Sequence, residues 1–182
     1  MKHIALAATL LMAVTSGWSQ QMKDSSAPVN NPVVTSVQQM EQRFSKNLTG
    51  AAETMPADKY SYKPTPDQMS FAHLMIHVAE SNNGLCTAIA GEKREVKLSE
   101  SDSKDTLAGA VKDSFAYCQQ VLAKADDSNL GQSVTTAGGQ STTRASAFIH
   151  LVAGWADHYS AAAMYLRLNN LLPPSAAKAD HK

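Results

Sequence analysis

The fold of this chain is decided by two histidine-bearing stretches, FAHLMIHVAE at residues 71–80 and HLVAGWADHYSAAAMYLRLNNLLPP at residues 150–174. In both stretches apolar residues recur every three to four positions, which is the spacing of an amphipathic α-helix. The first predicts a helix that starts at residue 67 or 70 and ends at residue 90, before a glycine. The second predicts a helix over about 142–170, which ends before two consecutive prolines.

Two further helices complete the pattern. Apolar residues at helical spacing predict one helix over residues 32–55 and another over residues 103–122, where a serine supplies the amino-terminal cap. The stretch 56–68 holds three prolines, and 126–141 holds glycines among small polar residues, so both are predicted as loops. No strand pattern is of comparable strength. The sequence therefore predicts an all-α fold, a four-helix bundle, with a looser all-α array as the alternative.

The amino-terminal residues have the features of a secretory signal. Basic residues precede an apolar run from Ile4 to Val14 that is too short to span a bilayer, and small residues follow it. The sequence predicts a signal peptide at 1–19, a flexible leader at 20–31, the bundle at 32–174 and a disordered tail at 175–182. A buried amino-terminal helix is the alternative. No later stretch is apolar for long enough to cross a membrane, so we expect an exported chain, periplasmic or secreted.

The charge of the chain excludes one class of partner. Lysine plus arginine and aspartate plus glutamate both number 16, so the formal net charge is zero. No basic stripe is present of the kind that neutralises phosphates, and nucleic acid is therefore not expected to bind. A small molecule or another protein is the expected partner, and the sequence leaves open whether the chain forms a homodimer.

The helical positions of the histidines separate them into two groups. At about 100° per residue, His158 lies roughly 70° from the centre of its apolar stripe and His77 roughly 110° from the centre of its own. His73 and His150 lie about 150° away from these centres. His77 and His158 are therefore predicted as the inner pair, and the other two as peripheral.

The inner pair suggests a metal site that lacks one ligand. A catalytic divalent metal takes three protein ligands and keeps an open position, and His77 and His158 supply only two. His73 precedes His77 by four residues on the predicted helix, a spacing at which two histidines share one ion. The sequence thus predicts His77, His158 and His73 as candidate ligands of a divalent transition metal, zinc or nickel. For each histidine, a surface position or a satisfied core position is the alternative.

Three stretches carry a resemblance to a known family. YSYKPTPDQMSFAHLMIHVAESNNGLCTAIAG at 60–91, FAYCQQ at 115–120 and HYSAAAMYLRLNNLLPP at 158–174 are together similar to the DinB-like (DinB/YfiT) family, over about residues 36–174. The resemblance implies a four-helix bundle of up-down-down-up order. It also implies a metal held by one histidine of the second helix and by two histidines, spaced H-x-x-x-H, of the fourth.

The resemblance assigns His77 as the first ligand and His158 as the last, and it places Gly154 where the remaining histidine belongs. A glycine has no side chain to bind a metal, so this chain departs from the family at that position. Either His73 substitutes, or the ion is weak or absent and the bundle has a binding or structural role.

The two cysteines bear on the topology. Cys86 lies about 27 Å along its predicted helix and Cys118 about 22 Å along the next. They are level if these helices run parallel, whereas a simple hairpin would offset them by roughly 16 Å, beyond the Cα separation of about 4.4–6.8 Å that a disulfide permits. Together with export, this geometry favours a Cys86–Cys118 disulfide. Two free buried thiols are the alternative.

Two functions from different classes are therefore predicted. The first is a non-catalytic exported bundle with a weak or vestigial metal site that binds a small molecule or a partner protein. The second is a metal-dependent hydrolase or thiol transferase. The resemblance to the DinB-like family implies this activity, because members of that family transfer small thiols or hydrolyse small substrates. Gly154 favours the first function.

Overall fold

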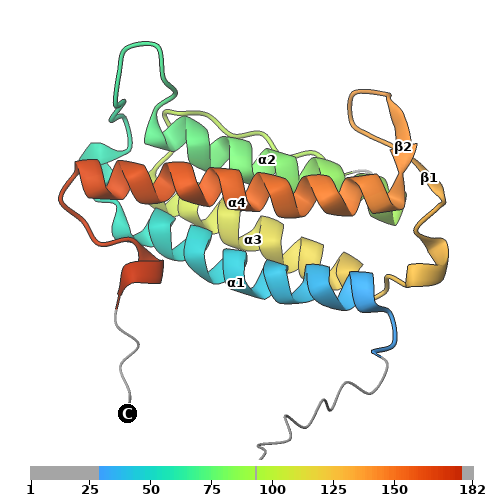
Figure 1. Cartoon of the computed structure of the whole chain (residues 1–182). Coiled ribbons are helices and arrows are strands. Elements are labelled where there is room, and N and C mark those ends of the chain that lie inside the picture. Colours follow the sequence, from blue (N-terminus) through green and yellow to red (C-terminus); the bar gives the residue numbers. More distant parts are fainter. Residues whose placement is uncertain (1–28, 93, 178–182) are drawn as a thin grey trace, which may run out of the picture.

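Four long helices make up most of the computed structural model, which describes residues 29–92 and 94–177 (Figure 1). The helices are α1 (Pro32–Thr54), α2 (Phe71–Ala90), α3 (Lys104–Leu122) and α4 (Arg144–Leu168). The predicted all-α four-helix bundle is confirmed. The predicted signal peptide at 1–19, and the leader up to residue 28, lie outside the described residues.

Helices α2 and α3 run in the same direction. Asn82 Nδ2 of α2 donates a hydrogen bond to Ser114 Oγ of α3 over 3.0 Å, and one turn further along both helices Cys86 is bonded to Cys118. The Cα atoms of the two cysteines are 5.4 Å apart. The structure therefore contains the Cys86–Cys118 disulfide that the sequence favoured. The parallel course of α2 and α3 places the two cysteines at the same level, as the disulfide requires.

The other two helices run in the opposite direction. Lys104 Nζ, at the start of α3, donates to the carbonyl of Glu53, at the end of α1, over 2.7 Å. Tyr165, near the end of α4, donates from its hydroxyl to the carbonyl of Met69, just before α2, over 2.7 Å. Both pairs join the end of one helix to the start of its neighbour. The order of the bundle is therefore up-down-down-up, as predicted.

The start of α1 is capped from a distant part of the chain. Asn31 precedes the helix without capping it through its side chain. Instead, the carboxylate of Asp127 accepts hydrogen bonds from the backbone N–H groups of Val33 and Val34, each over 2.9 Å. These donors have no partner within a helix, and a carboxylate at this end is also favoured by the helix dipole.

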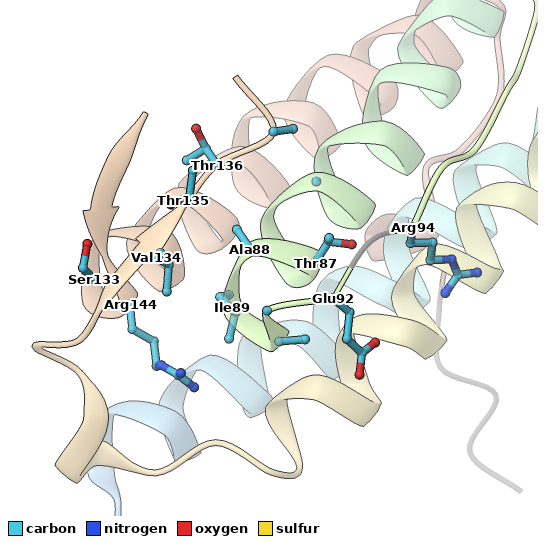
Figure 2. Close-up of a pocket in the computed structure, with 14 residues that line it drawn as sticks. Thr87, Ala88, Ile89, Glu92, Arg94, Ser133, Val134, Thr135, Thr136 and Arg144 are labelled. Carbon is cyan, nitrogen blue, oxygen red and sulfur yellow. The ribbon is translucent and has the colours of Figure 1, made fainter. Parts of the chain in front are cut away.

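The prediction of a loop over 126–141 is wrong in part, because a β-hairpin begins there. β1 (Ser133–Thr135) pairs antiparallel with β2 (Ser141–Thr143), and Val134 lies opposite Thr142. Each strand is only three residues long and mostly small and polar, so alternation of apolar and polar residues could not reveal it. Buried Val134 packs the hairpin against the end of α2 (Figure 2).

The core lies between the four helices and is mainly apolar. Its largest fully buried side chains are Trp155, Phe71, Phe115, Phe148, Leu48, Met55, Met75, Leu107, Leu122, Leu151, Leu166 and Val78. Ser175 and Ala176, which the sequence assigned to the tail, form a short 3-10 helix, η3 (Pro174–Ala176), beside α1. Among the described residues, none of the helices is both long and apolar enough to cross a membrane.

Candidate functional site

His77 of α2 and His158 of α4 meet at the surface of the bundle. The centroids of their rings are 4.8 Å apart, and the ring planes are inclined by 80°. His77 is exposed and His158 is half-buried. The antiparallel course of α2 and α4 brings the two histidines together, whereas His150 lies exposed two turns earlier on α4.

The histidine pair lies in a cleft of about 420 Å³ between α2, α4 and the segment before α2. Most of the other lining side chains are apolar or amphipathic, and two, Asp67 and Asp157, are carboxylates. The lining comprises Asp67, Gln68, Met69, Leu74, His77, Asp157, His158, Ala161, Met164 and Tyr165. A cleft of this size and composition suits a small, largely apolar molecule.

The surroundings of His158 favour its neutral form. Burial lowers the pKa of His158, the neighbouring His77 lowers it further, and the carboxylate of Asp157 opposes both effects. A neutral imidazole keeps one nitrogen lone pair free, so it can accept a hydrogen bond or bind a metal ion. The cleft therefore offers a half-buried acceptor beside apolar surface.

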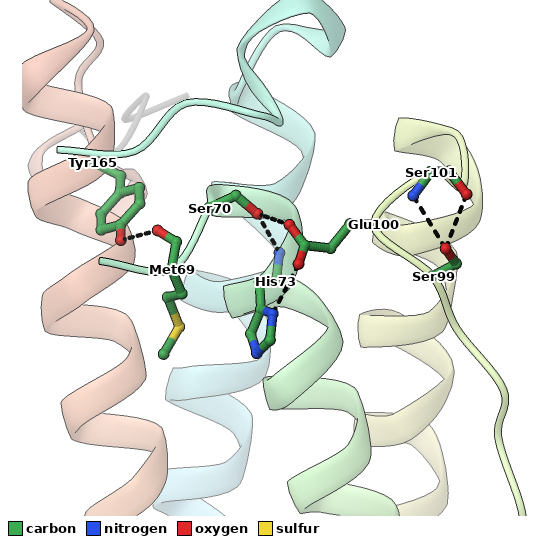
Figure 3. Close-up of polar contacts among 7 residues, drawn as sticks. All are labelled: Met69, Ser70, His73, Ser99, Glu100, Ser101 and Tyr165. Atoms are coloured by element: carbon green, nitrogen blue, oxygen red, sulfur yellow. Dashed lines mark hydrogen bonds and ion pairs between the residues drawn. The ribbon is translucent and has the colours of Figure 1, made fainter. Parts of the chain in front are cut away.

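His73 has a different partner. Its Nδ1 lies 3.0 Å from Oε1 of Glu100, which precedes α3, while Ser70 donates its hydroxyl to the other carboxylate oxygen (Figure 3). Ser70 also caps α2 by accepting from the backbone N–H of His73 over 3.0 Å. The hydrogen bonds from Ser70 and His73 lower the pKa of Glu100. His73 thus belongs to a cap at the start of α2, and its ring is turned toward Glu100 rather than toward His158.

Gly154 lies one turn before His158 and next to its ring. A Cβ atom added at Gly154 would be 3.6 Å from Cε1 and 3.9 Å from Nδ1 of His158, which is ordinary van der Waals contact. The position therefore has space for a side chain, but the glycine supplies no ligand atom.

The residues present do not fit a three-ligand metal site. Within residues 29–92 and 94–177, no group of three or more histidine, cysteine, aspartate or glutamate side chains is arranged to hold a metal ion. His77 and His158 supply two imidazoles, Gly154 supplies none, and His73 is bonded to Glu100. A tightly bound catalytic metal normally has three protein ligands.

Comparison with known proteins identifies the family. A sequence profile of the DinB superfamily matches residues 40–161, which include the histidine pair and both cysteines. The chain belongs to the DinB superfamily. No functionally curated protein matches the sequence.

Solved structures of DinB-like proteins share the fold. A DinB-like protein from Bacillus cereus is 13% identical, with 77% of this chain and 95% of that chain covered and a TM-score of 0.64. A DinB-like protein from Bacillus subtilis is 17% identical, with 74% and 92% covered and a TM-score of 0.61. A mycothiol-dependent maleylpyruvate isomerase is 14% identical, and this chain covers only 59% of its length, from 70% of its own, with a TM-score of 0.57. Identities this low show a common fold and not a common activity.

Two acidic residues near the histidines, Asp157 and Glu100, were not predicted as part of the site. Asp157 is exposed, but it also lines the cleft, and its carboxylate raises the pKa of His158. Its position directly before His158 was the available signal. Glu100 lies in the connection before α3, and nothing in its sequence context indicates that it reaches His73, 27 residues away.

Proposed function

We propose that this DinB superfamily protein is an exported binding protein whose His77–His158 cleft takes a small, largely apolar molecule and has only a weak or vestigial divalent-metal site. The observation that carries the proposal is the glycine beside His158. Position 154 has space for a side chain and has no donor atom, so two imidazoles are left where a catalytic metal needs three ligands.

The lining of the cleft supports binding as the role. Met69 and Met164, which are 41% and 54% exposed, line it together with the histidine pair. Methionine side chains are flexible and polarisable, and they are common at surfaces that adapt to apolar ligands. The neutral form of His158 adds a hydrogen-bond acceptor to the same cleft.

Two features support export. The apolar run near the amino terminus is typical of a secretory signal. The Cys86–Cys118 disulfide is of a kind that persists in oxidising compartments and is rare in the cytosol. Periplasmic or secreted protein is the localisation that we propose.

The metal content of the unmodified protein tests the proposal. Untagged protein purified without chelators should contain well under one zinc or nickel ion per chain by elemental analysis. Gly154→His should raise the zinc affinity by about tenfold or more, because it adds a third imidazole next to His158. Gly109→His is the matched control: it adds the same side chain on α3, where an added Cβ meets nothing within 4 Å.

Stoichiometric zinc or nickel in the unmodified protein would refute the weak-site reading. It would favour the alternative, a metal-dependent hydrolase or thiol transferase, which the facing histidines and the shared fold with a mycothiol-dependent isomerase also support. In that case His73→Ala should lower the metal content if His73 leaves Glu100 to become the third ligand. An unchanged content in His73→Ala would show that His73 is not a ligand of the ion.

A further inference from the structure

Besides the histidine cleft, two adjoining cavities lie at the other end of the bundle, away from Tyr165. One, of about 570 Å³, lies between the hairpin and the last turns of α2, and the other, of about 290 Å³, lies between the ends of α2 and α3. They share Ile89, Ala90, Glu92 and Arg144 as lining, so they adjoin. Arg144 is the first residue of α4, and Figure 2 shows its side chain beside the end of α2. Ile89 lies 12 residues beyond His77 on α2, so the cavities are about 18 Å from the histidine pair along the helix axis.

Arg144 is left with unused hydrogen-bonding capacity. Its Nε is buried and has no partner among the described residues. Its Nη2 makes one long hydrogen bond, of 3.3 Å, to Oε1 of Gln132, and it forms no ion pair with a described carboxylate. A guanidinium group is always charged and has five N–H donors, and a buried donor without an acceptor costs about 1–3 kcal/mol. Among the described residues, Nη1 donates to no partner and Nη2 has only this long bond, so the guanidinium keeps N–H donors that a bound anion would use.

The other charges around the cavities favour an anion of low charge. Arg94, Lys124 and Arg144 contribute positive charge, and Glu92 contributes the one carboxylate among the lining residues. Glu92 accepts a hydrogen bond from the Tyr117 hydroxyl over 3.4 Å, and its charge would oppose a dianion more than a monoanion. The last carbonyls of α2 also oppose a highly charged anion, because the carboxyl end of a helix carries partial negative charge.

The remaining surface is suited to a small organic body. Ile89 and Val134 are almost fully buried and form apolar floor, and Ala88 lies beside them (Figure 2). The hydroxyl-bearing residues Thr87 and Thr135 also line the larger cavity. We propose that these cavities bind a small monocarboxylate, with its carboxylate paired to the guanidinium of Arg144 and its apolar body on Ile89 and Val134. This site is separate from the proposed function of the histidine cleft and does not depend on it.

Titration with benzoate, followed by ¹H–¹⁵N NMR, tests the proposal. Benzoate should shift the amide signals of Ala88, Ile89 and Val134 saturably, with a dissociation constant of about 1 mM or tighter. Benzamide, which has the same shape without the charge, should bind about tenfold more weakly or not at all, because a charged acceptor makes the stronger pair with a guanidinium. Inorganic phosphate should bind more weakly than benzoate.

Variants distinguish the contribution of the Arg144 guanidinium to binding from its contribution to folding. Arg144→Gln should weaken benzoate binding by about tenfold or more, and Arg144→Lys by less, because lysine keeps the charge but loses the planar fork. Arg43→Gln is the matched control, since it removes an arginine from the exposed surface of α1. Ala88→Leu should also weaken binding by filling the cavity while Arg144 stays in place. Circular dichroism of each variant establishes that it is folded.

Three results would overturn the proposal. One is the absence of any saturable shift at about 10 mM benzoate in the unmodified protein. Another is equal affinity for benzoate and benzamide. The last is unchanged benzoate binding in folded Arg144→Gln. If Arg144→Gln lowers the melting temperature while the unmodified protein binds no benzoate, Arg144 serves only to stabilise the carboxyl ends of the helices. None of these results bears on the metal content of the histidine cleft.

Discussion

Trp155 of α4 donates a hydrogen bond from its indole Nε1 to Oδ1 of Asn82 on α2, over 2.7 Å, inside the core. Asn82 passes the interaction on, because its Nδ2 donates to Ser114 Oγ of α3. Ser114 in turn donates to the carbonyl of Val111 over 2.7 Å. A single buried asparagine therefore joins three of the four helices at one level. A buried amide whose oxygen and nitrogen are both hydrogen-bonded favours one alignment of the helices over others.

Removal of the Asn82 side chain should destabilise the bundle. Asn82→Ala leaves the Trp155 N–H buried without an acceptor and opens a small cavity, at a combined cost of about 2–3 kcal/mol of unfolding free energy. Urea denaturation followed by tryptophan fluorescence measures the loss. Asn83→Ala is the matched control, because Asn83 is also buried but its Oδ1 has no partner among the described residues. Equal losses in the two variants would contradict a special role for Asn82.

The disulfide should contribute substantially to stability. Cys86 and Cys118 are 32 residues apart, and closing a loop of that length in the unfolded chain corresponds to about 3–4 kcal/mol. The double variant Cys86→Ser, Cys118→Ser should therefore unfold at a lower urea concentration by that free energy, and reducing agent should lower the stability of the unmodified protein only. Mass spectrometry of intact protein, alkylated without reduction, should detect no added label. Two labels would show that the bond is not formed.

Asp127 should stabilise the protein by capping α1, although it lies 93 positions after Val34 in the sequence. Asp127→Ala removes both acceptors from the Val33 and Val34 N–H groups, and a lost cap of this kind costs about 1–2 kcal/mol. Thermal unfolding followed by circular dichroism measures it. Asp58→Ala should change little, since Asp58 is exposed and its ion pair with Lys59 is on the surface. A loss in Asp127→Ala no larger than that in Asp58→Ala would count against the cap.

Glu41 should make the stability depend on pH. It is 3% exposed on α1, and burial raises its pKa from 4.5 to about 7. Between these values the folded state keeps a proton that the unfolded state has lost, so the unfolding free energy falls as pH rises, by up to roughly 3 kcal/mol. Below about pH 4.5 the contribution is fully present, and above about pH 7 it is lost.

Replacement of Glu41 isolates this effect from the other titrating groups. Glu41→Gln should flatten the fall in stability between pH 4.5 and 7, and it should be more stable than the unmodified protein at pH 8. Urea denaturation at a series of pH values measures both changes. Glu53→Gln is the control, because Glu53 is an exposed glutamate of the same helix. Parallel pH profiles for the Glu41→Gln and unmodified proteins would rule out titration of Glu41 as the cause.

The sequence was sufficient for features that depend on local patterns. Helical periodicity predicted all four helices; the predicted Ser103 cap of α3 is confirmed, and Ser70 is the true start among the two that were predicted for α2. The positions of the cysteines along their helices pointed to the parallel pair, because side chains on helices of known length have calculable heights. The hairpin was missed, since three-residue strands carry no periodic signal.

Local sequence patterns could not predict contacts between segments that are distant in the sequence. Helical angles singled out His77 and His158, and the structure brings these two rings together. The same angles place His73 on the periphery but give no hint of Glu100, because the acceptor comes from an irregular connection. The cap of α1 by Asp127 is of the same kind. A side chain in a loop has no period from which its partner could be calculated.

The parallel course of α2 and α3 has a consequence for the way in which the chain reaches its fold. Two helices joined as a hairpin dock by closing from their shared turn, with the nearest residues meeting first. Here corresponding levels of α2 and α3 are about 32 residues apart throughout, as they are at the cysteine pair. Folding slows as the mean sequence separation of contacts rises, so this bundle should assemble more slowly than a simple up-down-up-down bundle of equal length. Cys86 and Cys118 are held side by side by the docking of α3 on α2, so we expect the covalent bond between them to form late in folding.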